Sequence, residues 1–449
     1  MSEIIDNEAF FKQMKDLLGE EYDEYISALS SERTRGVRAN TLKISPEELS
    51  EKIPVGAKIP FEKNGFFIDG IKLGNSPYHH AGLFYLQEPS AMLPVAAIAP
   101  YLKGKILDLC AAPGGKSTQI LNYMQDGSEL ICNEVVEARA NILASNLERM
   151  GAACTVISMS PSSLENKYPE YFDAIVVDAP CSGEGMFRKE ETAVRDWNLA
   201  NVKTCAARQY EILKSAEKML KPDGYIVYST CTLNKVENEE VILKFLDEFP
   251  YMQPVEPDEN VRKCTRRGFG LSETMRIFPH TFNGEGHFAC LMKKHAETDT
   301  VKIKFLNPFS PIKAEKNEIE RILRDMDVDL QMQDLGIFGD NVYIRPSDTG
   351  IPQGVRIFRG GLPIIQLKNG RGEPLHGLAT YLKKGRCNKT VSFPAESKEI
   401  DAYLKGEAIQ CDAPFGGYGV IAVDGYPLGL VKSNNGILKN HYPKGLRKR

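Results

Sequence analysis

The feature that most constrains the fold is an alternation of short apolar segments with helical segments between residues 76 and 295. The alternating segments are KILDL, STQILNYM, ELICN, ARANILASNLERMG, DAIVVDAP, QYEILKSAEKMLKPDG, YIVYST and NEEVILKFLDEF. This alternation is typical of βαβ units that build a mostly parallel sheet covered by helices. Because ligands bind beyond the carboxyl ends of such strands, we expect the chemistry at the strand-ending residues Asp108, Glu134, Asp178 and Cys231.

The flanking segments differ in character, and 449 residues suffice for two to four domains. Residues 1–75 combine a helical stretch with a predicted hairpin, whose turn at Asn64 and Gly65 would need positive φ angles. A polar segment with the helical stretch EIERILRDM follows residue 295, and β signals dominate after about residue 372. The predicted domains are a small α/β lobe (1–75), a Rossmann-like domain (76–295), an intermediate α/β domain (296–372) and a β-rich module (373–449).

Composition excludes several classes of protein. No apolar run approaches the ~18 residues of a membrane span, and the acidic N-terminus lacks the features of a signal peptide, so a cytoplasmic protein is expected. None of the ten cysteines forms a C-x-x-C pair, which argues against a zinc ribbon. The net charge of −4 gives no global sign of nucleic-acid binding, although residues 432–449 hold six basic residues and no acid. Alone, such a basic end is more typical of a solvated tail.

The segment KILDLCAAPGGKSTQIL has the order strand, small-residue loop, helix that is typical of a nucleotide-type site. Gly114 and Gly115 allow close approach of a ligand, and the helix start offers free amides to a carboxylate. Glu134 closes the next strand, where an acid can bind both hydroxyls of a ribose. A P-loop is excluded because Cys110 stands where its first glycine is required, and the G-x-G-x-x-G fingerprint is also missing.

The candidate reaction centre combines two further strand ends. The segment YFDAIVVDAPCSGEGMFRK delivers Asp178 and Cys181, and YIVYSTCTLNKVENEE delivers Cys231. Two cysteines at strand ends of a cofactor-binding sheet indicate covalent chemistry, although a single buried cysteine more often only packs. A thiolate adding to carbon 6 of a cytosine would turn carbon 5 into a nucleophile toward a methyl sulfonium. Asp178 could then stabilise the adduct near ring nitrogen 3, and Cys181 or a water could assist the final elimination.

Three motifs together resemble those of the Sun/Fmu-type RNA cytosine-5 methyltransferases: LDLCAAPGGKSTQ, DAPCSGEGMFRK and YSTCTLNKVENEE. RGVRANTLK, YLQEPSAMLP, RIFPHTFNGEGHFAC and LKNHYPKGLR resemble the bacterial RsmF-like branch, so the resemblance covers nearly the whole chain. It implies an S-adenosylmethionine methyltransferase core with an RNA-binding N-terminal lobe (1–75) and a C-terminal RNA-binding module of the PUA type. The basic end of the chain then becomes a predicted RNA contact.

The resemblance also assigns roles to residues. It implies Cys231 as nucleophile, Cys181 in product release, and Asp178 facing both cofactor and base. The cofactor pocket would be lined by Asp108, Cys110, Ala111, Ala112, Pro113, Gly114, Gly115, Lys116, Glu134 and Asp178. Where family members often carry an acid near the adenine, this chain has Ser158, Met159 and Ser160, so a hydroxyl or backbone amide is expected there.

The loop after Cys181 supplies candidate substrate contacts in Phe187, Arg188 and Lys189, since an aromatic ring can stack on a displaced base and cations can bind phosphates. A structural role is the alternative. His79, His80, His280 and His287 have no acid or cysteine at a ligand spacing, so no metal site is predicted. The RsmF-like resemblance implies 16S ribosomal RNA or the small ribosomal subunit as substrate, a cytosine of the decoding region as target, and a monomeric enzyme.

The residues alone leave several alternative substrates and functions open. Transfer RNA could be the substrate, or a DNA cytosine-5 methyltransferase could act through Cys181, the cysteine of the P-C pair. An amino-group methyltransferase would usually carry D-P-P-Y, whereas A-P-C follows Asp178. A non-catalytic RNA-binding factor for ribosome assembly could keep the fold without the chemistry, but the intact Cys231, Asp178 and cofactor loop argue against it.

Overall fold

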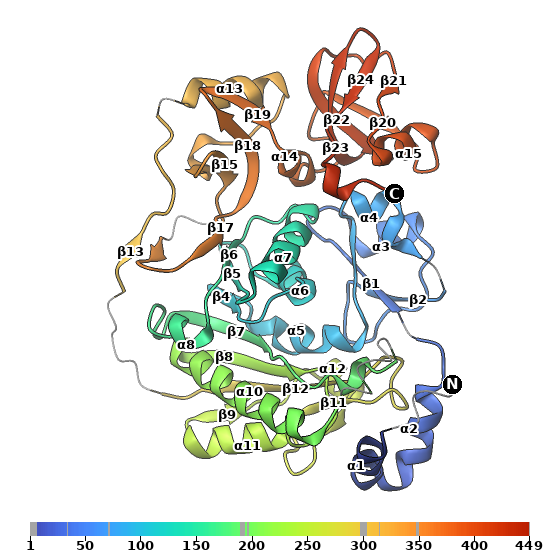
Figure 1. The fold of residues 1–449 in the computed structure, drawn as a ribbon, viewed down its shortest axis with the longest axis vertical. Helices are drawn as coiled ribbons and strands as arrows, with labels where there is room; N and C mark the ends of the chain where they lie inside the picture. Colours follow the sequence, from blue (N-terminus) through green and yellow to red (C-terminus); the bar gives the residue numbers. More distant parts are fainter. Residues whose placement is uncertain are drawn as a thin grey trace.

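The computed structural model describes residues 7–33, 35–70, 72–188, 194, 197–296, 303–313, 315–346 and 350–448. A ten-stranded sheet forms the centre of the molecule, in the order β10-β11-β12-β8-β7-β4-β5-β6-β17, with β9 paired to β12 (Figure 1). Its parallel strands are β4 (Lys105–Asp108), β5 (Glu129–Asn133), β6 (Thr155–Ile157), β7 (Phe172–Asp178) and β8 (Leu220–Thr230). The predicted parallel sheet is confirmed, and the carboxyl ends of these strands share one edge.

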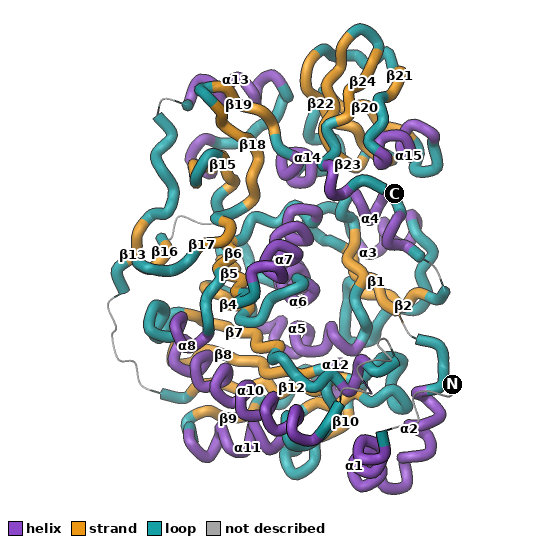
Figure 2. The backbone as a smooth tube through the Cα atoms, viewed as in Figure 1, coloured by secondary structure: helices purple, strands orange, loops and turns teal. Residues whose placement is uncertain are grey.

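Helices cover both faces of this sheet, as Figure 2 shows. One face packs against α5 (Leu93–Ile98), α6 (Gly115–Tyr123), α7 (Glu137–Arg149) and α12 (Glu259–Lys263). The other packs against α8 (Pro161–Leu164), α10 (Leu199–Met219) and α11 (Glu239–Glu248). Because both faces are buried, the parallel strands consist of nearly continuous apolar runs, which explains why the sequence located most of them.

The antiparallel part of the sheet was not anticipated from the sequence. It consists of β9 (Met252–Pro254), β10 (Arg266–Arg267), β11 (Met275–Ile277) and β12 (His287–Lys294), with β12 antiparallel to β8. This extension matters for function because it brings His287 to the edge where β7 and β8 end.

The N-terminal lobe is a three-stranded sheet with the order β2-β1-β3, flanked by short helices. Its elements are β1 (Arg35–Ala39), α3 (Pro46–Lys52), β2 (Gly65–Ile68), α4 (Pro77–His80) and β3 (Phe84–Leu86). The predicted boundary at residue 75 is wrong, because β3 lies beyond it and completes the sheet. The predicted turn is also wrong: neither Asn64 nor Gly65 has a positive φ, and β2 pairs with β1, the turn being closed by the Glu62 carbonyl and carboxylate.

The first helices, α1 (Glu8–Leu18) and α2 (Tyr22–Leu29), do not join this lobe. They pack on the central domain through a cluster that contains Phe10 and Met14 from α1 together with Trp197 and Phe278. Asn7 caps α1 and its side-chain amide donates to the carbonyls of Val194 and Trp197. Asn7 and α1 are therefore attached beside the loop that follows Cys181.

The intermediate region is built on the sheet β14-β15-β18-β19, which packs against α13. Its elements are β13 (Phe305–Leu306), α13 (Lys316–Asp325), β14 (Leu335–Phe338), β15 (Asn341–Ile344), β16 (Ile351–Pro352), β17 (Ile357–Arg359), β18 (Leu362–Lys368) and β19 (Arg371–Pro374). The predicted boundary at 372 falls inside β19. β17 leaves this region and pairs with β6, so it extends the central sheet.

The C-terminal module is a five-stranded sheet with the order β20-β22-β23-β24-β21. Its elements are α14 (His376–Tyr381), β20 (Thr390–Phe393), α15 (Lys398–Lys405), β21 (Ile409–Gln410), β22 (Gly417–Val423), β23 (Tyr426–Asn434) and β24 (Ile437–Asn440). Two tight turns, Asp424-Gly425 and Asn435-Gly436, join β22 to β23 and β23 to β24, and all four residues have positive φ angles.

The C-terminal module shares a hydrophobic core with the N-terminal lobe (Figure 1). Val37 and Leu83 of the lobe belong to the same buried cluster as Tyr403 and Leu428 of the module. The Tyr78 hydroxyl donates to Asp424 at 2.5 Å, across the same contact. Among the helices that the structure describes, none is both long and apolar enough to cross a membrane.

Candidate active site

The predicted reactive residues meet at the carboxyl edge of the central sheet. Asp108 ends β4, Asp178 ends β7, and Cys231 directly follows β8. The neighbouring strands β4, β7 and β8 are parallel, so all three residues lie at the same edge. In the sequence, Asp178 follows Asp108 by 70 positions and precedes Cys231 by 53 positions. The parallel topology of the sheet brings the three residues together.

Asp178 contacts three polar side chains at this edge. Its carboxylate accepts from the Ser229 hydroxyl at 2.9 Å and lies 2.7 Å from Lys116 Nζ and 3.7 Å from His287 Nε2. Burial alone would raise the pKa of Asp178, but the Lys116 ammonium and His287 hold this pKa well below its usual range. Asp178 is therefore a carboxylate at neutral pH.

The two candidate cysteines are in direct contact. Cys181 Sγ lies 3.2 Å from Cys231 Sγ, and both are half-buried free thiols. The contact with Cys231 is the largest cause that raises the pKa of Cys181 well above its ordinary value, followed by burial and the nearby Glu237 and Asp178. Cys181 is therefore a protonated thiol while Cys231 faces it.

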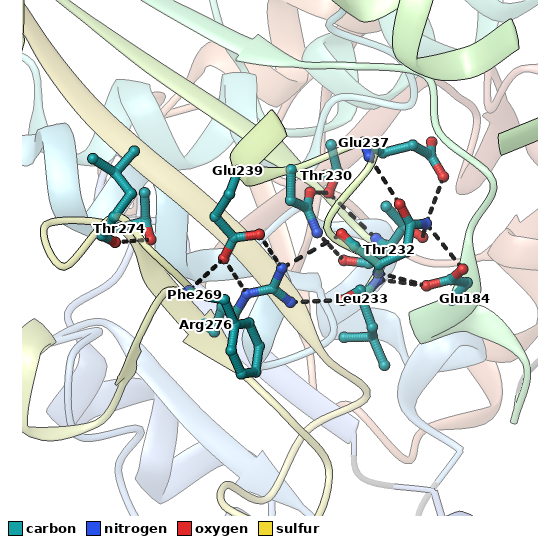
Figure 3. Close-up of polar contacts among 12 residues, drawn as sticks. Glu184, Thr230, Thr232, Leu233, Glu237, Glu239, Phe269, Thr274 and Arg276 are labelled. Atoms are coloured by element: carbon teal, nitrogen blue, oxygen red, sulfur yellow. Dashed lines mark hydrogen bonds and ion pairs between the residues drawn. The ribbon is translucent and has the colours of Figure 1, made fainter. Parts of the chain in front are cut away.

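Two buried carboxylates hold the loops that carry these cysteines (Figure 3). Glu184 accepts hydrogen bonds from the amides of Leu233 and Asn234, both at 2.8 Å, and from the Trp197 indole at 3.0 Å. Glu237 accepts from the Ser182 amide at 2.9 Å and from the Asn234 side chain at 2.8 Å. The loop after Cys181 is thus tied to the loop after Cys231.

A buried ion pair supports the same loop from the other side (Figure 3). Arg276 on β11 pairs with Glu239 on α11, and both side chains are 1% exposed. Arg276 also donates to the Leu233 carbonyl at 2.6 Å. Removing one partner of such a pair leaves an uncompensated buried charge, which typically costs about 3–5 kcal/mol. The backbone after Cys231 is therefore fixed on both sides.

The predicted cofactor loop runs from the end of β4 into α6. Asp108 is fully buried; its Oδ2 accepts from the Ser117 hydroxyl at 2.6 Å, whereas no described group bonds to Oδ1. Burial raises the pKa of Asp108 to about 7. Gly114 has a φ of 107°, in the left-handed region that favours glycine. A buried acceptor beside the free amides of a helix start fits a ligand with amino and carboxylate groups.

Comparison with known proteins identifies the family. Residues 95–293 match the family described as 16S rRNA methyltransferase RsmB/F, residues 7–89 the N-terminal domain of 16S rRNA methyltransferase RsmF, and residues 390–448 the methyltransferase RsmF PUA domain. Ribosomal RNA small subunit methyltransferase F of Erwinia tasmaniensis is 31% identical over 98% of this chain and 96% of its own length. The Salmonella agona protein of the same name is 32% identical over the same shares. The chain belongs to the RsmB/F family of methyltransferases.

A solved structure supports the same assignment. The crystal structure of a methyltransferase homologue from Pyrococcus horikoshii is 26% identical, has a TM-score of 0.56, and is matched over 65% of this chain and 96% of that one. The Sun/Fmu-type resemblance, the Rossmann-like core and the C-terminal PUA domain predicted from the sequence are therefore confirmed. As a member of the RsmB/F family, the chain is an RNA methyltransferase that uses S-adenosylmethionine.

The predicted cofactor loop of this RsmB/F member is held by side chains of α7. Arg139 donates to the Ala112 carbonyl at 2.9 Å, and Asn146 donates to the Pro113 carbonyl at 2.8 Å. Glu134 is buried, accepts from the Val136 amide at 2.9 Å, and lies 3.3 Å from Arg139. Of the remaining residues of the prediction, Cys110 and Ala111 lie in the same β4–α6 connection, and Gly115 is the first residue of α6.

The stretch at Ser158 to Ser160 directly follows β6, the strand that pairs with β5. The Ser158 amide donates to the Arg356 carbonyl at 3.1 Å, and the Met159 amide donates to the Asn133 side chain at 3.1 Å. These two backbone amides are therefore not free to bind an adenine. The Ser160 hydroxyl caps α8 by accepting from the Ser163 amide.

Two of the predicted substrate contacts, Phe187 and Arg188, have buried side chains. Phe187 is 3% exposed and packs edge-on against Phe10 with ring centroids 4.9 Å apart. Arg188 forms a buried ion pair with Glu285 at 2.7 Å and donates to the Ala28 carbonyl. The structure therefore favours the structural alternative for both, because neither side chain can reach a base in this conformation. Lys189 lies outside the described residues.

Sequence reasoning missed His287 and the carboxylates Glu184 and Glu237. His287 was treated as structural, yet it lies beside Asp178 on a strand that the pattern did not reveal. Both glutamates stand inside the quoted motifs, and a polar residue next to a reactive cysteine was the available signal. Their burial, which decides their role, is visible only in the structure.

Proposed function

We propose that the protein methylates carbon 5 of a cytosine in 16S ribosomal RNA, with Cys231 as nucleophile. The observation that carries this proposal is the contact of Cys231 with Cys181 beside an ionised Asp178, at the carboxyl edge of the sheet. An amino-group methyltransferase has no use for paired thiols, whereas addition to a pyrimidine ring requires a sulfur nucleophile.

The proposed reaction begins at Cys231. Its thiol gives up a proton to water, and the sulfur electron pair forms a bond to carbon 6 of the cytosine. The electrons of the 5,6 double bond then become available at carbon 5 for bonding to a methyl carbon. S-adenosylmethionine, when bound, supplies that electrophilic methyl group. The residues Asp108, Gly114, Gly115, Lys116 and Glu134 would hold it, by their fit to amino, carboxylate and ribose groups.

Asp178 serves the base as a carboxylate. Because Lys116 and His287 keep the pKa of Asp178 low, this residue is not an acid toward ring nitrogen 3 but accepts a hydrogen bond from the amino group of the cytosine. Lys116 Nζ lies 2.7 Å from Asp178, and a proton shared along this pair would neutralise the charge that develops on nitrogen 3.

Cys181 acts in the second half of the proposed reaction. Once Cys231 is bonded to carbon 6, the largest cause of the raised pKa of Cys181 is gone, because no second thiol faces it. Cys181 can then give its thiol proton to water, and the resulting thiolate takes the proton from carbon 5. The electrons of that C–H bond restore the 5,6 double bond, and the sulfur of Cys231 leaves with its electron pair.

The RNA substrate is proposed from the relatives. Their printed names specify the ribosomal RNA small subunit, and the matched PUA domain ends in the basic residues Lys432 to Lys448. We expect a cytosine of the decoding region to be flipped into the space between Asp178 and Cys231.

The test is transfer of a radiolabelled methyl group to small subunits, naked 16S RNA and transfer RNA from cells that lack the enzyme. Wild type, Cys231→Ala and Cys181→Ala are compared, and labelled nucleosides are identified after digestion. We expect 5-methylcytosine in the ribosomal RNA and none with Cys231→Ala. Full activity of Cys231→Ala would refute the nucleophile, label only in transfer RNA would refute the substrate, and loss of adduct only in Cys181→Ala would indicate the DNA-type mechanism.

A further inference from the structure

A groove outside the reaction centre runs between the N-terminal lobe and the loop that follows Cys181. Its volume is about 480 Å³. The floor is apolar and is formed by Ile68, Leu73, Leu86 and Met186. Three basic residues, Arg33, Arg35 and Lys72, line its sides, and all three are exposed.

The lining of this groove has more basic than acidic side chains, and Arg33 lies within electrostatic range of Glu285. Within the described part of the chain, none of Arg33, Arg35 and Lys72 forms an ion pair or a side-chain hydrogen bond. The two acids in the lining are already engaged: Glu285 pairs with Arg188 at 2.7 Å, and Glu88 accepts from the amides of Ser90 and Glu285. The groove therefore presents cations above an apolar floor, which is complementary to a polyanion that carries flat apolar rings.

The groove is adjacent to the nucleophile. Met186 lies in its floor, and the neighbouring Gly185 donates its amide hydrogen to the Cys231 carbonyl at 2.8 Å. Gly185 has no room for a side chain, since an added Cβ would lie 2.9 Å from that carbonyl oxygen. The groove lining at Met186 is thus one residue along the chain from Gly185, which contacts the backbone of Cys231.

We propose that this groove binds the single-stranded RNA segment next to the target cytosine. Arg33 and Arg35 contact its phosphates, and an unpaired base rests on the apolar floor. The inference rests on the proposed function, because a flipped cytosine at Cys231 places the neighbouring nucleotides within reach of Met186. Single-stranded RNA suits the site, since its bases are free to leave the stack and enter a pocket.

The experiment measures the salt dependence of RNA binding by the full-length protein. The probe is a fluorescein-labelled single-stranded oligonucleotide with the decoding-region sequence, titrated without a methyl donor so that the result does not depend on methylation. Each phosphate contact to single-stranded RNA contributes a slope of about 0.7 in log Kd against log salt. We expect Arg33→Ala/Arg35→Ala to lower the slope by about 1.4 and Arg33→Lys/Arg35→Lys to retain it.

The matched control is Lys313→Ala/Arg324→Ala, which removes two exposed cations from the intermediate region and should leave the slope unchanged. Melting temperature and cofactor affinity show that each variant is folded. A wild-type slope in Arg33→Ala/Arg35→Ala would overturn the proposal, even if methylation is confirmed. An unchanged RNA slope with weaker binding to assembled subunits would also overturn it, because the groove would then face a ribosomal protein.

Discussion

Cys181 Sγ and Cys231 Sγ lie 3.2 Å apart, so a base attached to one sulfur is within reach of the other. This contact gives the two cysteines different predicted phenotypes. Cys231→Ala should form no covalent complex with RNA, because the nucleophile is missing. Cys181→Ala should form the complex but release it slowly, so that a protein–RNA band resistant to denaturant accumulates on a gel. Equal amounts of this band in both variants would contradict the division of roles.

The same contact makes the site sensitive to oxidation. Hydrogen peroxide can take two electrons and two protons from the thiols, giving a disulfide and two waters, and the sulfurs need to approach by only about 1 Å. We expect peroxide to abolish activity with a mass loss of about 2 Da, and dithiothreitol to restore it. Bound RNA should protect the enzyme. Loss of activity in Cys181→Ser with the same reversibility would argue against this pair.

Glu184→Gln tests the support of the nucleophile loop. The carboxylate accepts from five donors, and an amide would turn an NH₂ group toward some of them. The expected destabilisation is about 2–4 kcal/mol, as for a buried network that loses its charged acceptor. A fall in kcat larger than the change in cofactor affinity would show that the loop position matters. Glu407→Gln, at an exposed site in the C-terminal module, is the control.

The domain junction should be destabilised by acid. His376 is 6% exposed, neither of its ring nitrogens has a described partner, and it faces Lys43, His80 and Tyr442 without an acid. Burial lowers the pKa of His376 to about 3, and burial likewise lowers the pKa of His80 to about 4. Below pH 6.5 the unfolded chain binds protons that the folded chain does not, so stability falls as pH falls.

For His376 alone the loss at pH 5 is about 2 kcal/mol. Replacing His376 by Leu should therefore flatten the melting temperature between pH 7 and pH 5 relative to wild type. The measurement is thermal unfolding at fixed ionic strength across that range. An unchanged pH dependence in His376→Leu would show that other groups control the acid sensitivity.

The sequence predicted the sheet and the cofactor loop because their signals are local. Asp108, Glu134, Asp178 and Cys231 all follow apolar runs long enough to be recognised, and parallel topology then brings them to one edge. His287 was missed because β12 is buried along nearly its whole length and its pairing with β8 is a long-range event. The role of Phe187 stayed open from the sequence, because an aromatic residue in a loop has the same sequence signal whether it binds a base or packs on a ring such as Phe10.

The domain limits were harder to predict for a related reason. β3 and β17 belong to sheets whose other strands are distant in sequence, so no local turn marks where a domain ends. The helices α1 and α2 show the same effect, because their apolar residues cover the central domain rather than the lobe that follows them in the chain.

The core shared by the N-terminal lobe and the C-terminal module has a consequence for biosynthesis. Val37 and Leu83 are translated more than three hundred residues before their partners Tyr403 and Leu428. The apolar face of the lobe therefore stays exposed while some three hundred residues are translated. Exposed apolar surface on a partly folded chain favours association with chaperones. A nascent chain that stalls before residue 403 would contain Asp108, Asp178 and Cys231 but would lack the residues that cover the apolar face of the lobe.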